Sequence, residues 1–139
     1  MIVLDTNVVS SLMRDEPDVG IAHWLNRLPE VSIWLTTITI FEVRYGIEVL
    51  PASRRRRRLE QEFGRVLNTE IQGRILPLDE NAAAAASVIA ATRRRSGRSS
   101  EIRDTLIAGI VISRRAKFAT RNVRHFGDLE IHLIDPWAN

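Results

Sequence analysis

The chain of 139 residues has no cysteine, and this absence excludes several kinds of chemistry. Disulfides, thiol catalysis and cysteine-based zinc or iron–sulfur sites are ruled out, and a reducing compartment is favoured. A long apolar run is also missing, since the longest, residues 106–112, is far shorter than the ~18 residues that a membrane span needs. No basic segment precedes the first apolar run. We therefore expect no signal peptide, no membrane association and a cytoplasmic location.

Common catalytic motifs are missing as well. Neither G-x-x-x-x-G-K nor G-x-G-x-x-G occurs, and no serine lies in a nucleophile-elbow context. The histidines His23, His125 and His132 are scattered, without the spacing of metal ligands. We expect these histidines to be surface or packing residues.

Lysine is nearly absent, because Lys117 is the only one and arginine carries the remaining basic charge. The net charge is only +3, but the arginines gather in groups. The groups are residues 54–58, then Arg93, Arg94, Arg95, Arg98 and Arg103, then Arg114, Arg115, Arg121 and Arg124. Arginine prefers planar, bidentate phosphate and carboxylate partners. The groups are either solvated helix faces or a contact surface for nucleic acid or an acidic protein.

Short apolar segments alternate with helical patterns along the chain. The predicted strands are residues 2–5, 32–36, 75–78, 117–120 and 131–134. The predicted helices run from Pro17 through Leu28, from Thr39 to Leu50, and over residues 54–72, 80–96 and 100–115, the last capped by Ser99 or Ser100. This alternation predicts a single α/β domain, residues 1–139, with a mostly parallel sheet of four to five strands and helices on both faces.

Polar residues follow three of the predicted strands. Asp5 ends the first, residues 120–122 (Thr-Arg-Asn) follow the fourth, and the second leads into the helix that carries Glu42. In open parallel sheets the functional crevice lies outside the carboxyl ends of the strands. We therefore expect these segments to meet at one edge of the sheet.

Three carboxylates are candidates for that edge, and each has a structural alternative. Asp5 could simply cap the next helix, and Glu42 could close a capping box with Thr39. Asp104 lies where a helix dipole favours an acid, and small residues after it, Ala108 and Gly109, would let its helix approach the sheet.

A divalent cation would relieve the repulsion between clustered carboxylates. Mg²⁺ or Mn²⁺ fits oxygen ligands, so we predict Asp5 and Asp104 as metal ligands, with Glu42 binding a second ion or orienting water. Glu101, one turn before Asp104, could share that site or be spare.

Four motifs in order resemble those of the PIN-domain ribonucleases, and most closely the VapC-type toxins. They are Asp5-Thr6-Asn7, Thr39-x-x-Glu42-x-x-x-Gly46, Asp104-x-x-Ile107-Ala108 and Thr120-Arg121-Asn122-x-x-x-Phe126. The ending Ile134-Asp135-Pro136-Trp137 is also similar to that of the family. The resemblance implies a single PIN domain with a three-layer α/β/α fold.

The resemblance further implies a toxin that cleaves RNA phosphodiester bonds with Mg²⁺, transfer RNA being a frequent target. Asp5, Glu42 and Asp104 would be catalytic, with support from Thr6, Asn7, Thr120 and Asn122. Asn122 stands where the family often has a fourth acid, which leaves one or two metal ions open. Implied partners are a second copy of the chain and an antitoxin, which alone would contact operator DNA.

The arginines near the predicted pocket would form a basic rim for RNA. These are Arg93, Arg98, Arg103, Arg121 and Arg124. The run at residues 54–58 is left open between a partner contact and solvation. Because Asn122 brings no charge, a non-catalytic scaffold within an antitoxin–operator complex is the alternative. A phosphatase with Asp5 as nucleophile fits less well, since Asn7 stands where such enzymes have a second acid.

Overall fold

A five-stranded sheet forms the centre of the computed structural model, which describes residues 1–138. Its strands are β1 (Ile2–Leu4), β2 (Ile33–Thr36), β3 (Ile75–Leu76), β4 (Lys117–Ala119) and β5 (Leu133–Ile134). The spatial order is β3-β2-β1-β4-β5, and every neighbouring pair is parallel. The predicted α/β class and the number of strands are confirmed.

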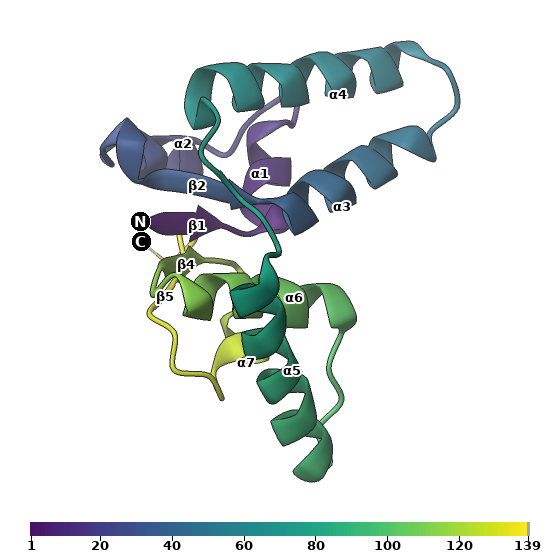
Figure 1. The fold of residues 1–139 in the computed structure, drawn as a ribbon. Helices are drawn as coiled ribbons and strands as arrows, with labels where there is room; N and C mark the ends of the chain where they lie inside the picture. The colour runs from purple at the N-terminus through teal and green to yellow at the C-terminus, as the bar shows by residue number, and fades with distance from the viewer. Residues whose placement is uncertain (139) are drawn as a thin grey trace.

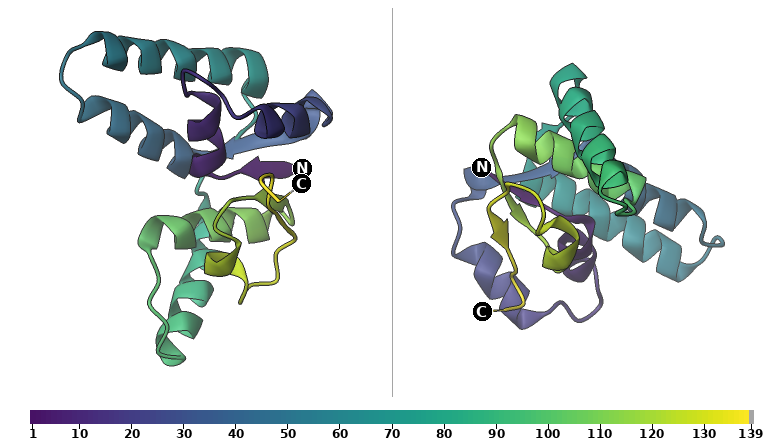
Figure 2. Two further views of the ribbon diagram at one scale, coloured as in Figure 1. Left: turned by 180° about the vertical axis from the view of Figure 1, so that it is seen from behind. Right: turned by 90° about the horizontal axis from the view of Figure 1, so that it is seen from below.

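Helices cover both faces of the sheet. They are α1 (Thr6–Leu12), α2 (Val19–Asn26), α3 (Thr37–Glu48), α4 (Arg54–Arg65), α5 (Glu80–Arg95), α6 (Ile102–Ser113) and α7 (Val123–Phe126), with short helical turns η1 (Glu30–Ser32) and η2 (Val66–Ile71). Helices α1 to α4 lie on one side of the sheet and α5 to α7 on the other, which confirms the three layers (Figures 1 and 2). No helix within residues 1–138 combines the length and apolarity that crossing a membrane requires.

The strands are apolar throughout because both of their faces are buried. Successive side chains point to opposite faces, so Ile2 and Leu4 join the core under α1 to α4, while Val3 joins the core under α5 to α7. In the second core Phe118 of β4 packs edge-on against Phe126 of α7, with ring centroids 5.0 Å apart. These two cores fix the strands whose ends carry the candidate site.

Helices α3 and α6 begin elsewhere than the sequence predicts. Helix α3 begins at Thr37, because the Thr36 hydroxyl accepts a 3.1 Å hydrogen bond from the Thr39 amide. Helix α6 is capped by Glu101 and not by a serine, because the Glu101 carboxylate accepts a 3.0 Å hydrogen bond from the Asp104 amide. Both differences change which side chains remain available for the site.

Two further predictions concern the helix over residues 54–72 and the end of α5. The predicted helix over residues 54–72 divides into α4 and the π-helical η2. Gly97, with a φ of 72°, follows the end of α5 as predicted.

The small residues after Asp104 allow a close approach, but Gly109 approaches a helix and not the sheet. A Cβ atom at Gly109 would lie 2.5 Å from the carbonyl oxygen of Ala82 and 2.7 Å from Cβ of Ala86. Both alanines belong to α5. Helices α5 and α6 therefore pack backbone to backbone at this point, which holds α6 and its first turn in place.

Part of the arginine run of α4 is used within the fold. Arg56 pairs with Glu48 and with Glu60, each at 3.0 Å. Arg58 pairs with Asp15 at 2.9 Å and donates a hydrogen bond to the carbonyl of Met13. These two arginines tie α4 to the end of α3 and to the segment after α1.

Candidate active site

The site lies where the order of the strands reverses. From β1 the chain proceeds outward to β2 and β3, and it later returns to place β4 on the other side of β1. A crevice forms at such a reversal, outside the carboxyl ends of the two central strands. Asp5 follows β1 and Thr120 follows β4, so both residues face this crevice.

Asp5 is held firmly at the bottom of the crevice, with only 5% of its surface exposed. Its carboxylate accepts hydrogen bonds from the Thr120 hydroxyl at 2.7 Å, the Thr6 amide at 2.8 Å and the Asn7 side-chain amide at 3.2 Å. The bond from Thr6 caps α1, so the capping interpretation is correct, and the same carboxylate also faces the pocket.

The buried position of Asp5 is electrostatically costly. Burial raises the pKa of Asp5 from 3.8 to about 6, although the bonds from Thr120 and Thr6 oppose the rise. The charges of Asp104 and Glu42 raise this pKa further. A carboxylate in such an environment favours a bound proton or a bound cation.

The capping-box interpretation of Glu42 is wrong, because α3 begins at Thr37 and Glu42 lies beyond its first turn. The Glu42 carboxylate instead accepts a 2.9 Å hydrogen bond from the Thr6 hydroxyl. Arg103 of α6 approaches the other carboxylate oxygen to 3.9 Å. Burial raises the pKa of Glu42, while the Thr6 bond and Arg103 lower it. Thr6 thus bridges Asp5 and Glu42 through its amide and its hydroxyl.

Asp104 enters the pocket from the first turn of α6, with a quarter of its side chain exposed. One carboxylate oxygen lies 3.5 Å from Nδ1 of His125. Glu101 is occupied with capping α6 and with Arg103, which lies 3.2 Å away. Glu101 does not line the pocket that holds Asp5, so Asp104 is the one residue of α6 among the lining residues.

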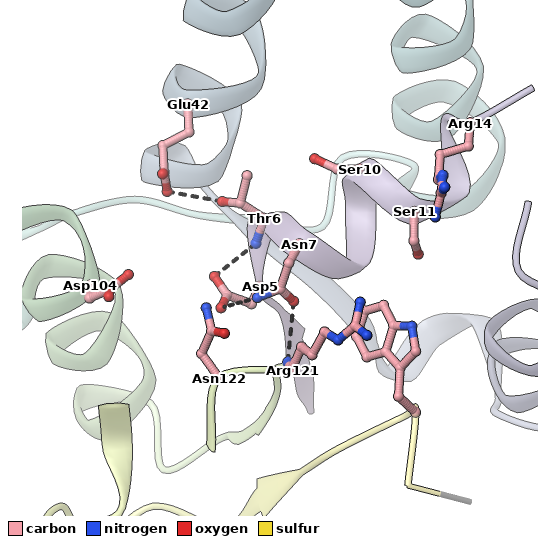
Figure 3. Close-up of a pocket in the computed structure, with 11 residues that line it drawn as sticks. Asp5, Thr6, Asn7, Ser10, Ser11, Arg14, Glu42, Asp104, Arg121 and Asn122 are labelled. Atoms are coloured by element: carbon pink, nitrogen blue, oxygen red, sulfur yellow. Dashed lines mark hydrogen bonds between the residues drawn. The ribbon is translucent and has the colours of Figure 1, made fainter. Parts of the chain in front are cut away.

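These side chains line one pocket of about 500 Å³ (Figure 3). Its lining residues are Asp5, Thr6, Asn7, Ser10, Ser11, Arg14, Glu42, Asp104, Arg121, Asn122 and Trp137. Within residues 1–138 no three acidic or histidine side chains stand close enough to hold a metal ion by themselves. Magnesium usually takes one or two protein carboxylates and completes its shell with water and substrate phosphate. Asp5 and Asp104, which line the same pocket, are the residues that would form such a pair.

Two supporting residues come from the segment after β4. The Thr120 hydroxyl donates to Asp5 and accepts a 3.0 Å hydrogen bond from the Asn122 amide. The side chain of Asn122 is exposed and lines the pocket between Asp5 and Asp104 (Figure 3). Asn7 accepts a 3.3 Å hydrogen bond from the Arg121 amide, which ties this segment to α1.

The predicted arginine rim is only partly at the surface. Arg121 lines the pocket, while Arg98 lines a neighbouring cavity that also borders Asp104. Arg103 is partly exposed and Arg124 is exposed.

Arg93, in contrast, is buried, and this corrects its expected place on the rim. Its guanidinium makes two hydrogen bonds to Asp128, at 2.9 and 3.0 Å, and others to the His125 carbonyl and the Ser100 hydroxyl. These four hydrogen bonds use four of its five N–H groups within the protein, so Arg93 supports the packing of this region and is not part of an exposed rim.

The sequence prediction missed four lining residues and the neighbour of Asp104. The four are Ser10, Ser11, Arg14 and Trp137, and the neighbour is His125. The first three follow Asn7 at spacings of three, four and seven, which places them on one helical face. That spacing was a usable signal. His125 and Trp137 reach the site only through the tertiary fold.

Known proteins are similar to this chain in sequence and in fold. Residues 2–130 match the PIN domain family. The chain is 31% identical over 137 residues to VapC ribonuclease Y4jK of Sinorhizobium fredii, covering 99% of this chain and 98% of that protein. It is 30% identical over 137 residues to toxin FitB of Neisseria gonorrhoeae, covering 99% of both. The structure of FitAB bound to the IR36 DNA fragment matches it with a TM-score of 0.88 and 30% identity, over 99% of this chain and 96% of that one.

Proposed function

The chain belongs to the PIN-domain family and to its VapC-type toxins, and we propose that it is a toxin that acts as a Mg²⁺-dependent endoribonuclease. We treat the whole chain as one PIN domain. The observation that carries the proposal is the pocket itself, which brings Asp5, Glu42 and Asp104 together from three separate elements.

Asp5 and Asp104 are the residues that would hold the metal ion, Mg²⁺ or alternatively Mn²⁺. Both are oxygen donors, and the raised pKa of Asp5 reflects a burial penalty that a cation offsets. When bound, such an ion activates water and neutralises the charge that develops on the phosphate. One such pair fits one ion, since Asn122 adds no charge to a second site.

The other residues position this pair. Thr120 and Asn7 orient the carboxylate of Asp5 through their hydrogen bonds. Glu42, oriented by Thr6, is placed to accept a proton from the attacking water or to hold that water in line.

The basic residues around the pocket would attract the RNA backbone. Arg98, Arg103 and Arg121 are at least partly exposed and lie near the carboxylates, and Arg124 is exposed on α7. Contacts of this kind give affinity and salt dependence without reading the base sequence. We therefore propose RNA as substrate, with transfer RNA as the first target to test.

The partners follow from the relatives, whose names describe toxins and a complex bound to DNA. We propose that an antitoxin covers the pocket and alone contacts operator DNA, in the cytoplasm. We also propose a homodimer. Phe41 and Tyr45 stack on the outer face of α3, their ring centroids 5.9 Å apart, and Val49 continues this exposed apolar face. More than half of each of these three side chains is exposed, as is typical of an interface.

The test is RNA cleavage by the purified protein with Mg²⁺, with Mn²⁺ and with EDTA. We expect cleavage only with a divalent ion and products without a 2′,3′-cyclic phosphate, because water and not the 2′-hydroxyl attacks phosphorus. Cleavage that is unchanged in EDTA would contradict the proposal.

A non-catalytic scaffold is the second candidate. Asn122 and the lack of three closely placed ligands within residues 1–138 favour it. Under this alternative Mg²⁺ would neither stabilise the protein nor support turnover on any RNA.

A further inference from the structure

The pocket has a cationic half beside its acidic half. Helix α1 supplies Ser10 and the segment after it supplies Arg14, while the segments after β4 and β5 supply Arg121 and Trp137. Figure 3 shows Ser10 and Arg14 on the side of α1 away from Asp104. The cavity of about 500 Å³ lies within the roughly 300–1,000 Å³ of ligand pockets and extends well beyond the carboxylates.

Arg121 is held in a defined position within this half. Its guanidinium carbon lies 5.0 Å from the centre of the Trp137 ring, within the range of a cation–π contact. The Arg121 amide is fixed to Asn7, and the Trp137 amide donates a 2.9 Å hydrogen bond to Asp135. Trp137 also packs against the first hydrophobic core. Arg121 therefore stacks on a Trp137 ring that is itself fixed by its contacts with the core.

Stacking leaves the hydrogen-bonding edge of Arg121 available. A guanidinium stacks through its flat face, whereas its five N–H groups point outward in the plane. Within residues 1–138 neither Arg121 nor Arg14 forms an ion pair with a carboxylate, in contrast to Arg56, Arg93 and Arg103. Two uncompensated guanidiniums that line one pocket favour an anionic ligand.

We propose that Arg121, positioned by Trp137, and Arg14 bind backbone phosphate of the RNA strand next to the bond that lies at the carboxylates. This inference rests on the proposed function. The acidic half repels phosphate without a cation, so a neighbouring phosphate in the cationic half offsets that repulsion and sets the direction in which the strand crosses the pocket. The contact takes any sequence, because it involves the backbone and not a base edge.

The test is equilibrium binding of a fluorescein-labelled single-stranded RNA of ten nucleotides in EDTA, over a series of salt concentrations. Each phosphate contact contributes about 0.7 to the slope of log K against log salt for a single strand. We expect Arg14→Gln and Arg121→Gln each to reduce the slope by about 0.7. Arg27→Gln is the control, since Arg27 is exposed, lines none of these cavities and loses the same charge. Slopes of both variants equal to that of Arg27→Gln overturn the inference.

Trp137 is tested as a positioning residue by a double-mutant cycle. Trp137→Leu removes the aromatic face and should weaken RNA binding in the wild-type background but not in the Arg121→Gln background. Trp137→Phe keeps a ring and should restore most of the binding. A loss that is equal in both backgrounds means that Trp137 acts independently of Arg121, and it overturns the positioning role.

The two proposals fail in different ways. Slope changes as expected without Mg²⁺-dependent cleavage would retain the phosphate site and reject the nuclease. Cleavage by wild type with unchanged slopes would retain the nuclease and reject the phosphate site. If the arginine variants bind RNA as wild type does but no longer bind an acidic peptide, the cationic half contacts a protein. That result overturns the inference.

Discussion

The hydroxyl of Thr120 donates a 2.7 Å hydrogen bond to a carboxylate oxygen of Asp5, joining residues that are 115 positions apart in the sequence. This bond connects the ends of β1 and β4, the two strands between which the crevice opens. It orients the carboxylate but does not compensate its burial, because the pKa of Asp5 remains raised. The site is thus ordered and, without a cation, electrostatically unfavourable.

Asp5→Asn should stabilise the metal-free protein at neutral pH. The pKa of Asp5 is raised from 3.8 to about 6 in the folded state, so the stability it contributes is present below pH 4 and is lost as the pH rises to 6. Asparagine has no such titration. At pH 7.5 without metal we expect Asp5→Asn to exceed wild type by about 2–3 kcal/mol in the free energy of unfolding.

Urea denaturation at pH 4 and pH 7.5 measures this difference. At pH 4 the advantage of Asp5→Asn should disappear. Mg²⁺ should stabilise wild type and leave Asp5→Asn unchanged. Equal stability of the two proteins at pH 7.5 without metal would show that Asp5 is not penalised by burial.

Gly109→Ala should destabilise the protein by roughly 1–3 kcal/mol, because the added Cβ meets the backbone of α5. Gly46→Ala is the matched control. It also lies in a helix, but its added Cβ would meet no atom within 4 Å, so we expect a gain of about 0.5–1 kcal/mol. Thermal unfolding compares the two, and an equal effect of both would contradict the close packing of α5 and α6.

Arg93→Met should destabilise the fold by about 1–3 kcal/mol, because it removes the hydrogen bonds of a buried guanidinium to Asp128, the His125 carbonyl and the Ser100 hydroxyl. The neighbouring Arg94 is exposed and forms no ion pair within residues 1–138, so Arg94→Met should change stability by less than about 0.5 kcal/mol. Urea denaturation measures both. Loss of RNA binding by Arg93→Met at unchanged stability would restore Arg93 to the rim.

The double variant Phe41→Glu with Tyr45→Glu should be monomeric. Both side chains are more than half exposed on α3, and two charges there oppose burial in an interface. Sedimentation velocity compares it with wild type, for which we expect a dimer. Val88→Glu is the control, because Val88 is equally exposed on α5. If the double variant sediments as wild type does, α3 is not part of the dimer interface.

Much of the fold follows from local sequence patterns. The five strands are predictable because apolar runs of that length between helices require burial on both faces, and Ile2, Val3 and Leu4 behave in this way. Asp5 is predictable because it ends such a run. The start of α6 is not, because Ser99 and Ser100 are preferred caps by residue type, whereas the structure uses Glu101, which is not a preferred cap.

The remaining site residues need the three-dimensional structure. Arg93 and Arg98 lie in the same arginine-rich stretch, yet Arg93 is buried against Asp128 and Arg98 is exposed. This difference depends on how α7 packs, which the sequence does not reveal. His125 and Trp137 lie in segments that the sequence comparison singled out, but their place beside Asp104 and Arg121 depends on the tertiary fold.

The most direct test of the central claim is the initial rate of Mg²⁺-dependent RNA cleavage by single variants of the three carboxylates. Asp5→Asn, Glu42→Gln and Asp104→Asn should each reduce the cleavage rate by more than roughly 100-fold. A loss of this size exceeds the one that is typical when a group only supports a metal ligand. Glu48→Gln, on the same helix as Glu42 but 70% exposed and paired with Arg56, should cleave as wild type does. Wild-type rates for Asp5→Asn or Asp104→Asn would contradict the account.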